Sequence, residues 1–219
     1  MATYIAIKTT VANLLMGLLE VNSGKITFIN KEINQYLKYE KKNFRKNIQM
    51  VFQDPYGSLN PRKTIGTTLS LAIKIHFKLS EDEIKNKVFE LLEKVELTPP
   101  EVFYERHPHE LSGGQQQRVA IARAISTEPK LIISDEAVAS LDMSIRSEIL
   151  KLLKKINIET KVSMIMISHD LSVLKNMCNR IAIMHLGKIV EIGDKEKILG
   201  SPQHNYTKKL ISATLEIPN

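Results

Sequence analysis

The chain has little of several residue types. It carries one cysteine, Cys178, and no tryptophan, and aromatic residues make up 5% of its length. A single cysteine excludes an internal disulfide and is typical of a reducing compartment. No apolar run approaches the roughly 20 residues that a membrane-spanning helix needs, and the N-terminal residues lack the basic and then apolar order of a secretory signal. We therefore expect a cytosolic protein without membrane spans of its own.

The length and charge of the chain leave several broad classes open. With 219 residues, 43% of them hydrophobic, it can bury a proper core and suits one domain, or one domain with an inserted lobe. The formal charge is +7, from 31 basic and 24 acidic residues, which is compatible with nucleic acid, anionic lipid or a nucleotide as a partner. The lysines are scattered, and no basic run is interleaved with aromatic residues. We therefore expect a solvated lysine surface rather than a nucleic-acid interface.

The order of apolar segments predicts alternating helices and strands. Two near-continuous apolar runs, 131–134 and 162–167, have the composition of parallel strands covered on both faces, and an amphipathic helix over 145–158 separates them. The other expected elements are a helix over 9–20, strands over 25–29 and 48–52, and a helical region over about 57–108 in which Ser80 and Glu83 form a capping box. This order predicts an α/β domain that carries a helical insertion.

A serine followed by two glycines is the most informative segment of the chain. Ser112, Gly113 and Gly114 stand directly before an apolar helical run. They would place backbone N–H groups and a hydroxyl at a helix start, where the helix dipole favours an anion. The glycines would let a phosphate approach without a Cβ in the way. By itself, Ser-Gly-Gly is more often an ordinary serine N-cap, so its meaning depends on the residues around it.

Polar residues also follow the predicted buried strands. Asp135 and Glu136 end the first run, His169 follows the second, and Gln53 follows the strand predicted over 48–52. In a parallel α/β sheet, ligands collect at the carboxyl ends of the strands. An aspartate there can hold Mg²⁺, the next carboxylate can orient an attacking water, and a histidine can contact a terminal phosphate. Each of these residues alone is more often structural, so their weight comes from occurring together.

Together these segments resemble the ATP-binding cassette (ABC) ATPases from residue 8 onward, with residues 111–118 matching the signature motif of that family. The resemblance implies an α/β fold of the P-loop NTPase type, with a parallel-sheet core and an inserted α-helical subdomain, and it implies ATP and Mg²⁺ as ligands. It assigns catalysis to Glu136 and His169, and metal binding to Thr9, Gln53 and Asp135. The residues that it implies for nucleotide binding are Lys8, Thr9, Thr10, Gln53, Ser112, Gly113, Gly114, Gln115 and Asp142.

The same resemblance implies a division of the chain. Residues 1–219 would form a single nucleotide-binding domain. Its α/β core would comprise 1–56 and 119–200, its helical signature subdomain 57–118, and a C-terminal tail 201–219.

Three segments are similar to the corresponding parts of oligopeptide, dipeptide and nickel importers. They are residues 53–62, residues 108–111 and the tail segment 201–210. The likeness implies a second ABC ATPase subunit as a heterodimer partner, two membrane-spanning permease subunits and, indirectly, an extracellular or periplasmic substrate-binding protein. It implies a peripheral location on the cytoplasmic face of the membrane and no nucleic-acid partner.

The phosphate loop departs from the family pattern, which reads Gly-x-x-x-x-Gly-Lys-Ser/Thr. Ala2 and Ile7 stand at the two glycine positions in front of Lys8 and Thr9. A β-branched residue is poorly suited to a positive φ angle and adds bulk where the backbone should approach phosphate. The sequence also shows no strand in front of this loop, so we expect a sheet core that lacks its N-terminal strands, from a truncated or mis-started reading frame.

Three functions remain open at this point. The first is an ATP-hydrolysing subunit that energises a peptide or nickel importer. The second is a catalytically impaired subunit that gives only its Ser112–Gln115 segment to the ATP site of a partner. The third is a soluble ABC protein that acts on ribosomes or nucleic acid. It is the least favoured, because the chain has neither a tandem cassette nor a long coiled-coil insertion.

Overall fold

The computed structural model describes residues 3–6 and 9–215, and for residues 3–6 and 214–215 it describes the backbone alone. The strands are β1 (Thr3–Ala6), β2 (Thr27–Phe28), β3 (Lys31–Glu32), β4 (Ile48–Val51), β5 (Leu131–Asp135), β6 (Ser163–Ile167), β7 (Arg180–His185) and β8 (Lys188–Asp194). The helices are α1 (Thr9–Leu15), α2 (Ile33–Asn47), α3 (Pro55–Ser58), α4 (Ile65–His76), α5 (Glu81–Lys94), α6 (Pro100–Glu105), α7 (Gly113–Ile125), α8 (Met143–Thr160), α9 (Leu171–Met177), α10 (Lys195–Gly200) and α11 (Asn205–Leu215), with a 3-10 turn over Pro108–Glu110.

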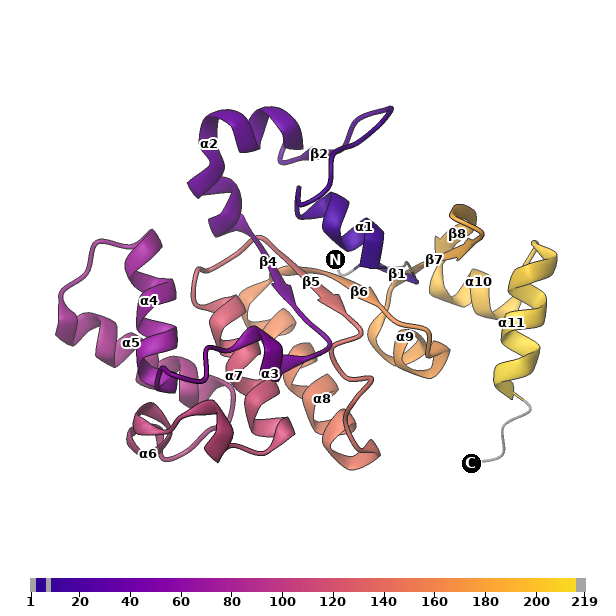
Figure 1. Cartoon of the computed structure of the whole chain (residues 1–219). Coiled ribbons are helices and arrows are strands. Elements are labelled where there is room, and N and C mark those ends of the chain that lie inside the picture. Colours follow the sequence, from indigo (N-terminus) through magenta and orange to yellow (C-terminus); the bar gives the residue numbers. More distant parts are fainter. Residues whose placement is uncertain (1–2, 7–8, 216–219) are drawn as a thin grey trace.

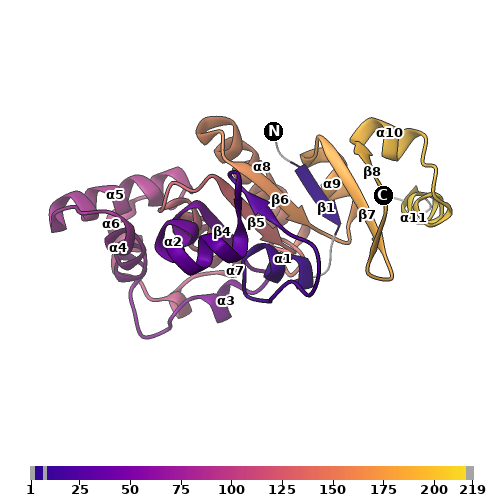
Figure 2. The same ribbon diagram turned by 90° about the horizontal axis from the view of Figure 1, so that it is seen from above.

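β1 and the strands β4 to β8 form one layer across the middle of the fold, and β2 and β3 form a separate hairpin. β4, β5 and β6 pair in parallel, with Val51 opposite Ser134 and Asp135 opposite Ile167. β1 pairs in parallel with β7, which pairs in antiparallel with β8. Because β1 also lies against β6, the two groups of strands continue one another (Figure 2). The expected α/β fold with a parallel sheet is confirmed.

The position of β1 corrects one expectation. The alignment with the phosphate-loop pattern predicts that residues 3–6 belong to that loop and not to a strand. The structure instead gives Thr3–Ala6 a strand conformation, paired with Arg180–Ile183 of β7. The pairing partner lies far away in the sequence, so a four-residue strand leaves little local signal. Only residues 7 and 8 separate β1 from α1. Ala2, Ile7 and Lys8 lie outside the described residues.

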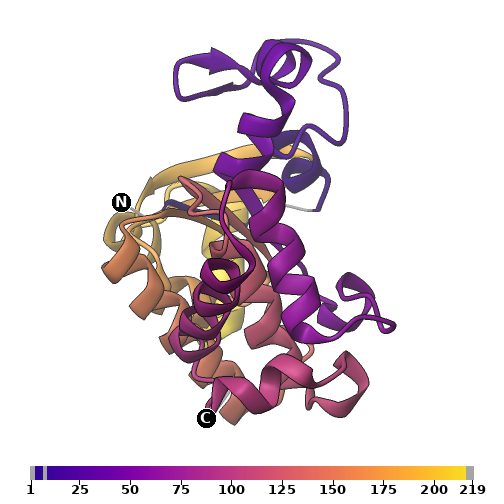
Figure 3. The same ribbon diagram turned by 90° about the vertical axis from the view of Figure 1, so that its left-hand side faces the viewer.

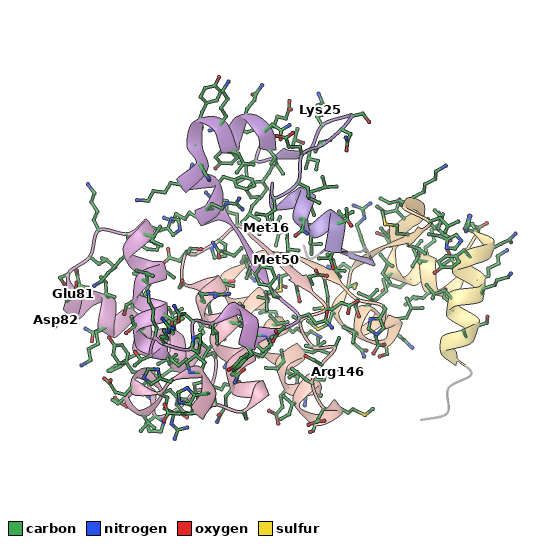
Figure 4. The ribbon with its side chains drawn as sticks, viewed as in Figure 1. Met16, Lys25, Met50, Glu81, Asp82 and Arg146 are labelled. Carbon is green, nitrogen blue, oxygen red and sulfur yellow. The ribbon has the colours of Figure 1, made fainter. Side chains whose placement is uncertain are left out.

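Both faces of the sheet are covered. On β5, Ile132 belongs to a large buried cluster that includes Ile121 of α7 and Ile149 of α8. The next residue, Ile133, belongs to a second cluster on the other face, together with Phe44 of α2. Successive side chains on a strand point to opposite faces, so burial on both faces explains the continuous apolar run. Met16 and Met50, which belong to this second cluster, are labelled in Figure 4.

Local signals explain where several helices begin and end. The capping box before α5 is confirmed: the Ser80 hydroxyl accepts from the Glu83 N–H at 3.3 Å, and Glu83 Oε2 accepts from the Ser80 N–H at 2.8 Å. α1 ends at Leu15, earlier than expected, because the backbone turns at Gly17 with φ +60°. A Cβ at Gly17 would lie 2.2 Å from Leu37 Cδ1, so the turn requires glycine.

Three groups of elements extend from the central layer. α4, α5 and α6 pack on one another at one end, and α10 and α11 lie at the opposite end (Figure 1). The small β2–β3 hairpin and α2 project from a third side, as Figure 3 shows. In the described part of the chain, none of the helices has the length and apolar character to traverse a bilayer.

Candidate functional site

The predicted site residues Thr9 and Asp135 meet at the carboxyl ends of the strands. Asp135 ends β5 and is 6% exposed, and Thr9 begins α1. The Thr9 side chain hydrogen-bonds the Asp135 carboxylate. Burial raises the pKa of Asp135 above its ordinary value, the neighbouring Glu136 charge raises it further, and the Thr9 hydrogen bond opposes both. Asp135 Oδ1 is buried and has no hydrogen-bond partner within the described residues.

Glu136 and His169 are brought into contact at the same edge of the sheet. The Glu136 N–H donates to the Ile167 carbonyl at 2.9 Å, which extends the β5–β6 pairing by one step. Glu136 adopts φ +46°, an uncommon conformation for a residue with a side chain. Its Oε1 lies 3.2 Å from Nδ1 of His169, whose side chain is 73% exposed. The backbone hydrogen bond and this conformation therefore place the Glu136 carboxylate against a solvent-accessible histidine.

Gln53 is held in place through its backbone. It follows β4 by two positions and is exposed, and its carbonyl accepts a hydrogen bond from the Ser140 hydroxyl at 3.3 Å. One residue earlier, the Phe52 carbonyl accepts from Nε2 of the fully buried Gln117, at 3.5 Å. The segment after β4 is thus held by the Ser140 loop on one side and by α7 on the other. Asp142, another predicted site residue, is exposed at the start of α8.

Ser112–Gln115 forms the start of α7. The Ser112 hydroxyl accepts from the Gln115 N–H at 3.3 Å, and Gln115 Oε1 accepts from the Ser112 N–H at 3.0 Å. The serine therefore acts as an N-cap in this chain, whatever else it binds. Among the described residues, no hydrogen bond or ion pair joins this segment to Asp135, Glu136 or His169.

The two signature glycines have different surroundings. A Cβ built on Gly114 would lie 2.7 Å from Cγ2 of Ile145, on α8. A Cβ on Gly113 would come no closer than 3.9 Å to the Leu141 side chain. Gly114 therefore serves the close packing of α7 on α8, a requirement that the sequence did not reveal. Gly113, by contrast, has room beside its Cα.

Sequence reasoning missed Arg146. Its Nη2 donates to the carbonyls of Ala139 and Leu141, at 3.3 and 3.5 Å, and its Nη1 lies 3.4 Å from Oδ2 of Asp170. Arg146 is the fourth residue of α8. A cation is unfavourable near a helix N-terminus because of the helix dipole. An arginine this close to the expected helix start is therefore a sequence signal that its side chain has partners outside the helix.

The donor set at Asp135 fits magnesium. Mg²⁺ is commonly held by one or two carboxylates together with substrate phosphates and water, and here a buried carboxylate oxygen lacks a partner beside a threonine hydroxyl. Within the described residues, no group of three or more His, Cys, Asp or Glu side chains gathers as a metal site. The arrangement therefore suits a cation that takes most of its ligands from a bound phosphate.

Comparisons with known proteins show which family and which relatives the chain is similar to. The family model described as "ABC transporter" matches residues 8–139. The oligopeptide transport ATP-binding protein OppF of Haemophilus influenzae is 43% identical over 94% of this chain and 62% of its own length. The glutathione import ATP-binding protein GsiA of Escherichia coli (strain K12) is 42% identical over 94% of this chain and 33% of its own. The chain thus spans about a third of the glutathione import proteins and less than two thirds of the oligopeptide transport protein.

Two solved structures share the fold. One is cbiO1 from Clostridium perfringens, described as part of the ABC transporter complex cbiONQ. It has a TM-score of 0.81 and 30% identity, over 99% of this chain and 84% of that chain. The other is the ATP-binding cassette MJ0796 in a dimeric, post-hydrolysis state bound to ADP and Pi. It has a TM-score of 0.76 and 28% identity, over 88% of this chain and 85% of that chain.

Proposed function

The chain belongs to the ABC transporter family, and from this premise we propose that it is an ATP-binding and ATP-hydrolysing subunit that energises an importer of peptides. Its likeness to ATP-binding proteins of oligopeptide and glutathione import supports this substrate class. Dipeptides and nickel are substrates of the importer group that the tail and the segment after Gln53 resemble. The substrate itself would be selected by other subunits.

The observation that carries the proposal is the grouping of Thr9, Asp135, Glu136 and His169 at one edge of the sheet. Glu136, fixed by the Ile167 carbonyl, orients the water that attacks the terminal phosphate, and His169 contacts that phosphate. Thr9 and Asp135, with Gln53 on the neighbouring strand end, would hold Mg²⁺, which supplies charge neutralisation on the phosphates. Lys8 and Thr10 would complete the contacts to the nucleotide.

The proposal includes shared ATP sites. Ser112, Gly113, Gly114 and Gln115 form a helix start whose N–H groups can face an anion, and we assign them to nucleotide held by a second ATP-binding subunit. Asp142, exposed before α8, would contact that subunit. The helical part over 57–118 would face two membrane-spanning permease subunits, and the substrate-binding protein would act through them. This arrangement would hold the chain at the cytoplasmic face of the membrane.

A second candidate function is favoured by the connection between β1 and α1. Two residues separate these elements, and Ala2 and Ile7 occupy the glycine positions of the phosphate-loop pattern. A chain that holds ATP poorly could still close on ATP bound by a partner through Ser112 and Gly113. In that case the subunit would activate hydrolysis without performing it.

The two functions are separated by Mg-ATP titration calorimetry on the purified full chain and by an ATPase assay. In the assay, the chain is mixed with an oligopeptide-importer ATP-binding subunit whose phosphate loop is intact. We expect weaker Mg-ATP binding than by that subunit. ATP binding by the chain with turnover lost in Glu136→Gln supports the first function. Absent binding with stimulation of the partner's turnover supports the second. If the chain neither binds Mg-ATP nor stimulates the partner's turnover, both functions are refuted.

A further inference from the structure

Arg146 connects two loops that lie far apart in the sequence. Its Nη2 donates to the carbonyls of Ala139 and Leu141, in the loop between β5 and α8, at 3.3 and 3.5 Å. Its Nη1 lies 3.4 Å from Oδ2 of Asp170, which directly follows His169. The residue is labelled in Figure 4, and its side chain is 30% exposed. A planar guanidinium can make these contacts together, whereas an ammonium group cannot reproduce the fork.

The carboxylate that receives Arg146 is itself held in place. Asp170 Oδ1 accepts from the N–H and the hydroxyl of Ser172, at 2.8 and 2.6 Å, and thereby caps α9. Burial works against its charged form, but hydrogen bonds from Ser172 and Val173 and the nearby Arg146 together hold the pKa of Asp170 below its ordinary value. Asp170 is therefore a fixed negative charge with one oxygen directed to α9 and the other to Arg146.

These contacts close a ring around the proposed catalytic pair. The Ala139 N–H donates to the Glu136 carbonyl at 2.9 Å, and the Ala139 carbonyl accepts from Arg146. Arg146 Nη1 contacts Oδ2 of Asp170, the residue after His169. His169 Nδ1 in turn lies 3.2 Å from Oε1 of Glu136. A displacement of either loop must therefore move Arg146 or break one of its contacts.

A purely local role for Arg146 explains less. It occupies the N-terminal part of α8, where the helix dipole disfavours a cation. Its Nε is buried without a hydrogen-bond partner in the described part of the chain, which is costly for a guanidinium. The hydrogen bonds of Arg146 to Ala139, Leu141 and Asp170 offset these two costs.

We propose that Arg146 is a positioning residue that couples the loop of residues 139–142 to the loop that carries His169, and so sets the Glu136–His169 geometry. The inference rests on the proposed function for the roles of Glu136 and His169. The coupling itself is a property of the chain without nucleotide. Its test therefore fails or succeeds independently of ATP binding.

The first test is amide hydrogen exchange on the full chain with Asp170→Asn. Asparagine keeps an oxygen for the α9 cap and removes the charge that Arg146 contacts. We expect exchange at Ala139 and Leu141, whose N–H groups are bonded within their loop, to accelerate about tenfold, as for a lost hydrogen bond to a charged group. Among the described residues, Asp170 makes no hydrogen bond to that loop, so faster exchange there reports the coupling.

Ser172→Ala is the matched control. It removes the 2.6 Å hydroxyl contact to Asp170 Oδ1 and leaves Oδ2 for Arg146. Exchange should rise at the start of α9 and stay unchanged at Ala139 and Leu141. Unchanged exchange at these two amides in Asp170→Asn would overturn the proposal. So would an equal rise there and at the buried β5 amide of Ile133, which would mean global loosening.

The second test is the ring NMR signal of His169 in Arg146→Lys, assigned by its disappearance in His169→Gln. The substitution keeps the charge and removes the two-armed guanidinium, and among the described residues no hydrogen bond joins Arg146 to His169. We expect the His169 signal to shift in Arg146→Lys. It should not shift in Arg45→Lys, in which an arginine that donates to the Met16 carbonyl at 2.7 Å is changed in the same way. An unmoved His169 signal in Arg146→Lys would overturn the proposal.

Discussion

Asp135→Asn should stabilise this chain in the absence of metal ions. The wild-type carboxylate is 6% exposed, has one oxygen without a partner among the described residues, and lies beside the Glu136 charge. The raised pKa of Asp135 means that the fold favours the neutral form over the charged form. Asparagine is a neutral side chain of nearly the same shape, so it removes the cost of burying a charge at pH 7.

The size of the effect follows from two opposing contributions. A buried polar group without a partner costs about 1–3 kcal/mol, and more if it is charged. The Thr9 hydrogen bond is weaker to an amide oxygen than to a carboxylate, which offsets part of the gain. A net stabilisation on the order of 1 kcal/mol remains, and for a chain of this size it raises the Tm by roughly 2–4 °C.

The pH dependence has a definite sign. Because the pKa of Asp135 is raised on folding, its protonated form contributes stability that is fully present below the ordinary value of 3.8 and is lost as the pH rises through the folded-state pKa. The Asp135→Asn variant lacks this loss. Its advantage over wild type should therefore be largest near neutral pH and shrink as the pH falls toward 3.8.

The measurement is thermal unfolding of the full chain with EDTA, at neutral and at acidic pH. Thr9→Val serves as the matched control, because it removes the hydrogen bond that favours the charged carboxylate and should lower the Tm at pH 7. Added Mg²⁺ should raise the Tm of wild type more than that of Asp135→Asn, since the amide is a weaker ligand. A wild type that is at least as stable as Asp135→Asn at pH 7 in EDTA would refute the reasoning.

Three further predictions concern the start of α7, the cap of α5 and the proposed catalytic carboxylate. Gly114→Ala should lower the free energy of unfolding by about 1–3 kcal/mol, because its Cβ would meet Ile145 at 2.7 Å. Gly113→Ala should lower the free energy of unfolding by less than about 1 kcal/mol. Denaturant titration compares the two variants, and equal losses would contradict the packing argument. Ser80→Ala should cost about 1 kcal/mol through loss of the α5 cap, and an unchanged urea midpoint would show that the capping box is idle. Glu136→Gln should abolish turnover in an active assembly while ATP binding persists, and undiminished turnover would remove Glu136 from the mechanism.

The sequence predicted the central part of the fold because local signals dominate there. The apolar runs that became β5 and β6, the helix between them and the Ser80 capping box all follow from composition and spacing. β1 was missed because its pairing with β7 joins distant parts of the chain. The segment also matches a loop motif in the sequence, and four residues carry only a weak strand pattern.

The candidate site shows the same division. Asp135, Glu136 and His169 could be predicted because strand-end polar residues in a parallel sheet share an edge. The left-handed backbone of Glu136, the contact of Gly114 with Ile145 and the fork of Arg146 could not. The last two depend on how α8 packs against a helix and a loop, and spacing along the chain carries no information on that packing.

The two candidate functions depend on two different helix starts, which differ in helix length and in their surroundings. α7 begins with a serine cap and a glycine with open space, over 13 residues that pack against the sheet. α1 has seven residues and is separated from β1 by two. A phosphate cradle uses several successive backbone N–H groups at the start of a helix. Contact with ATP through Ser112 and Gly113 would therefore use a 13-residue helix with room at Gly113, whereas ATP bound at Thr9 would lie at the start of a seven-residue helix.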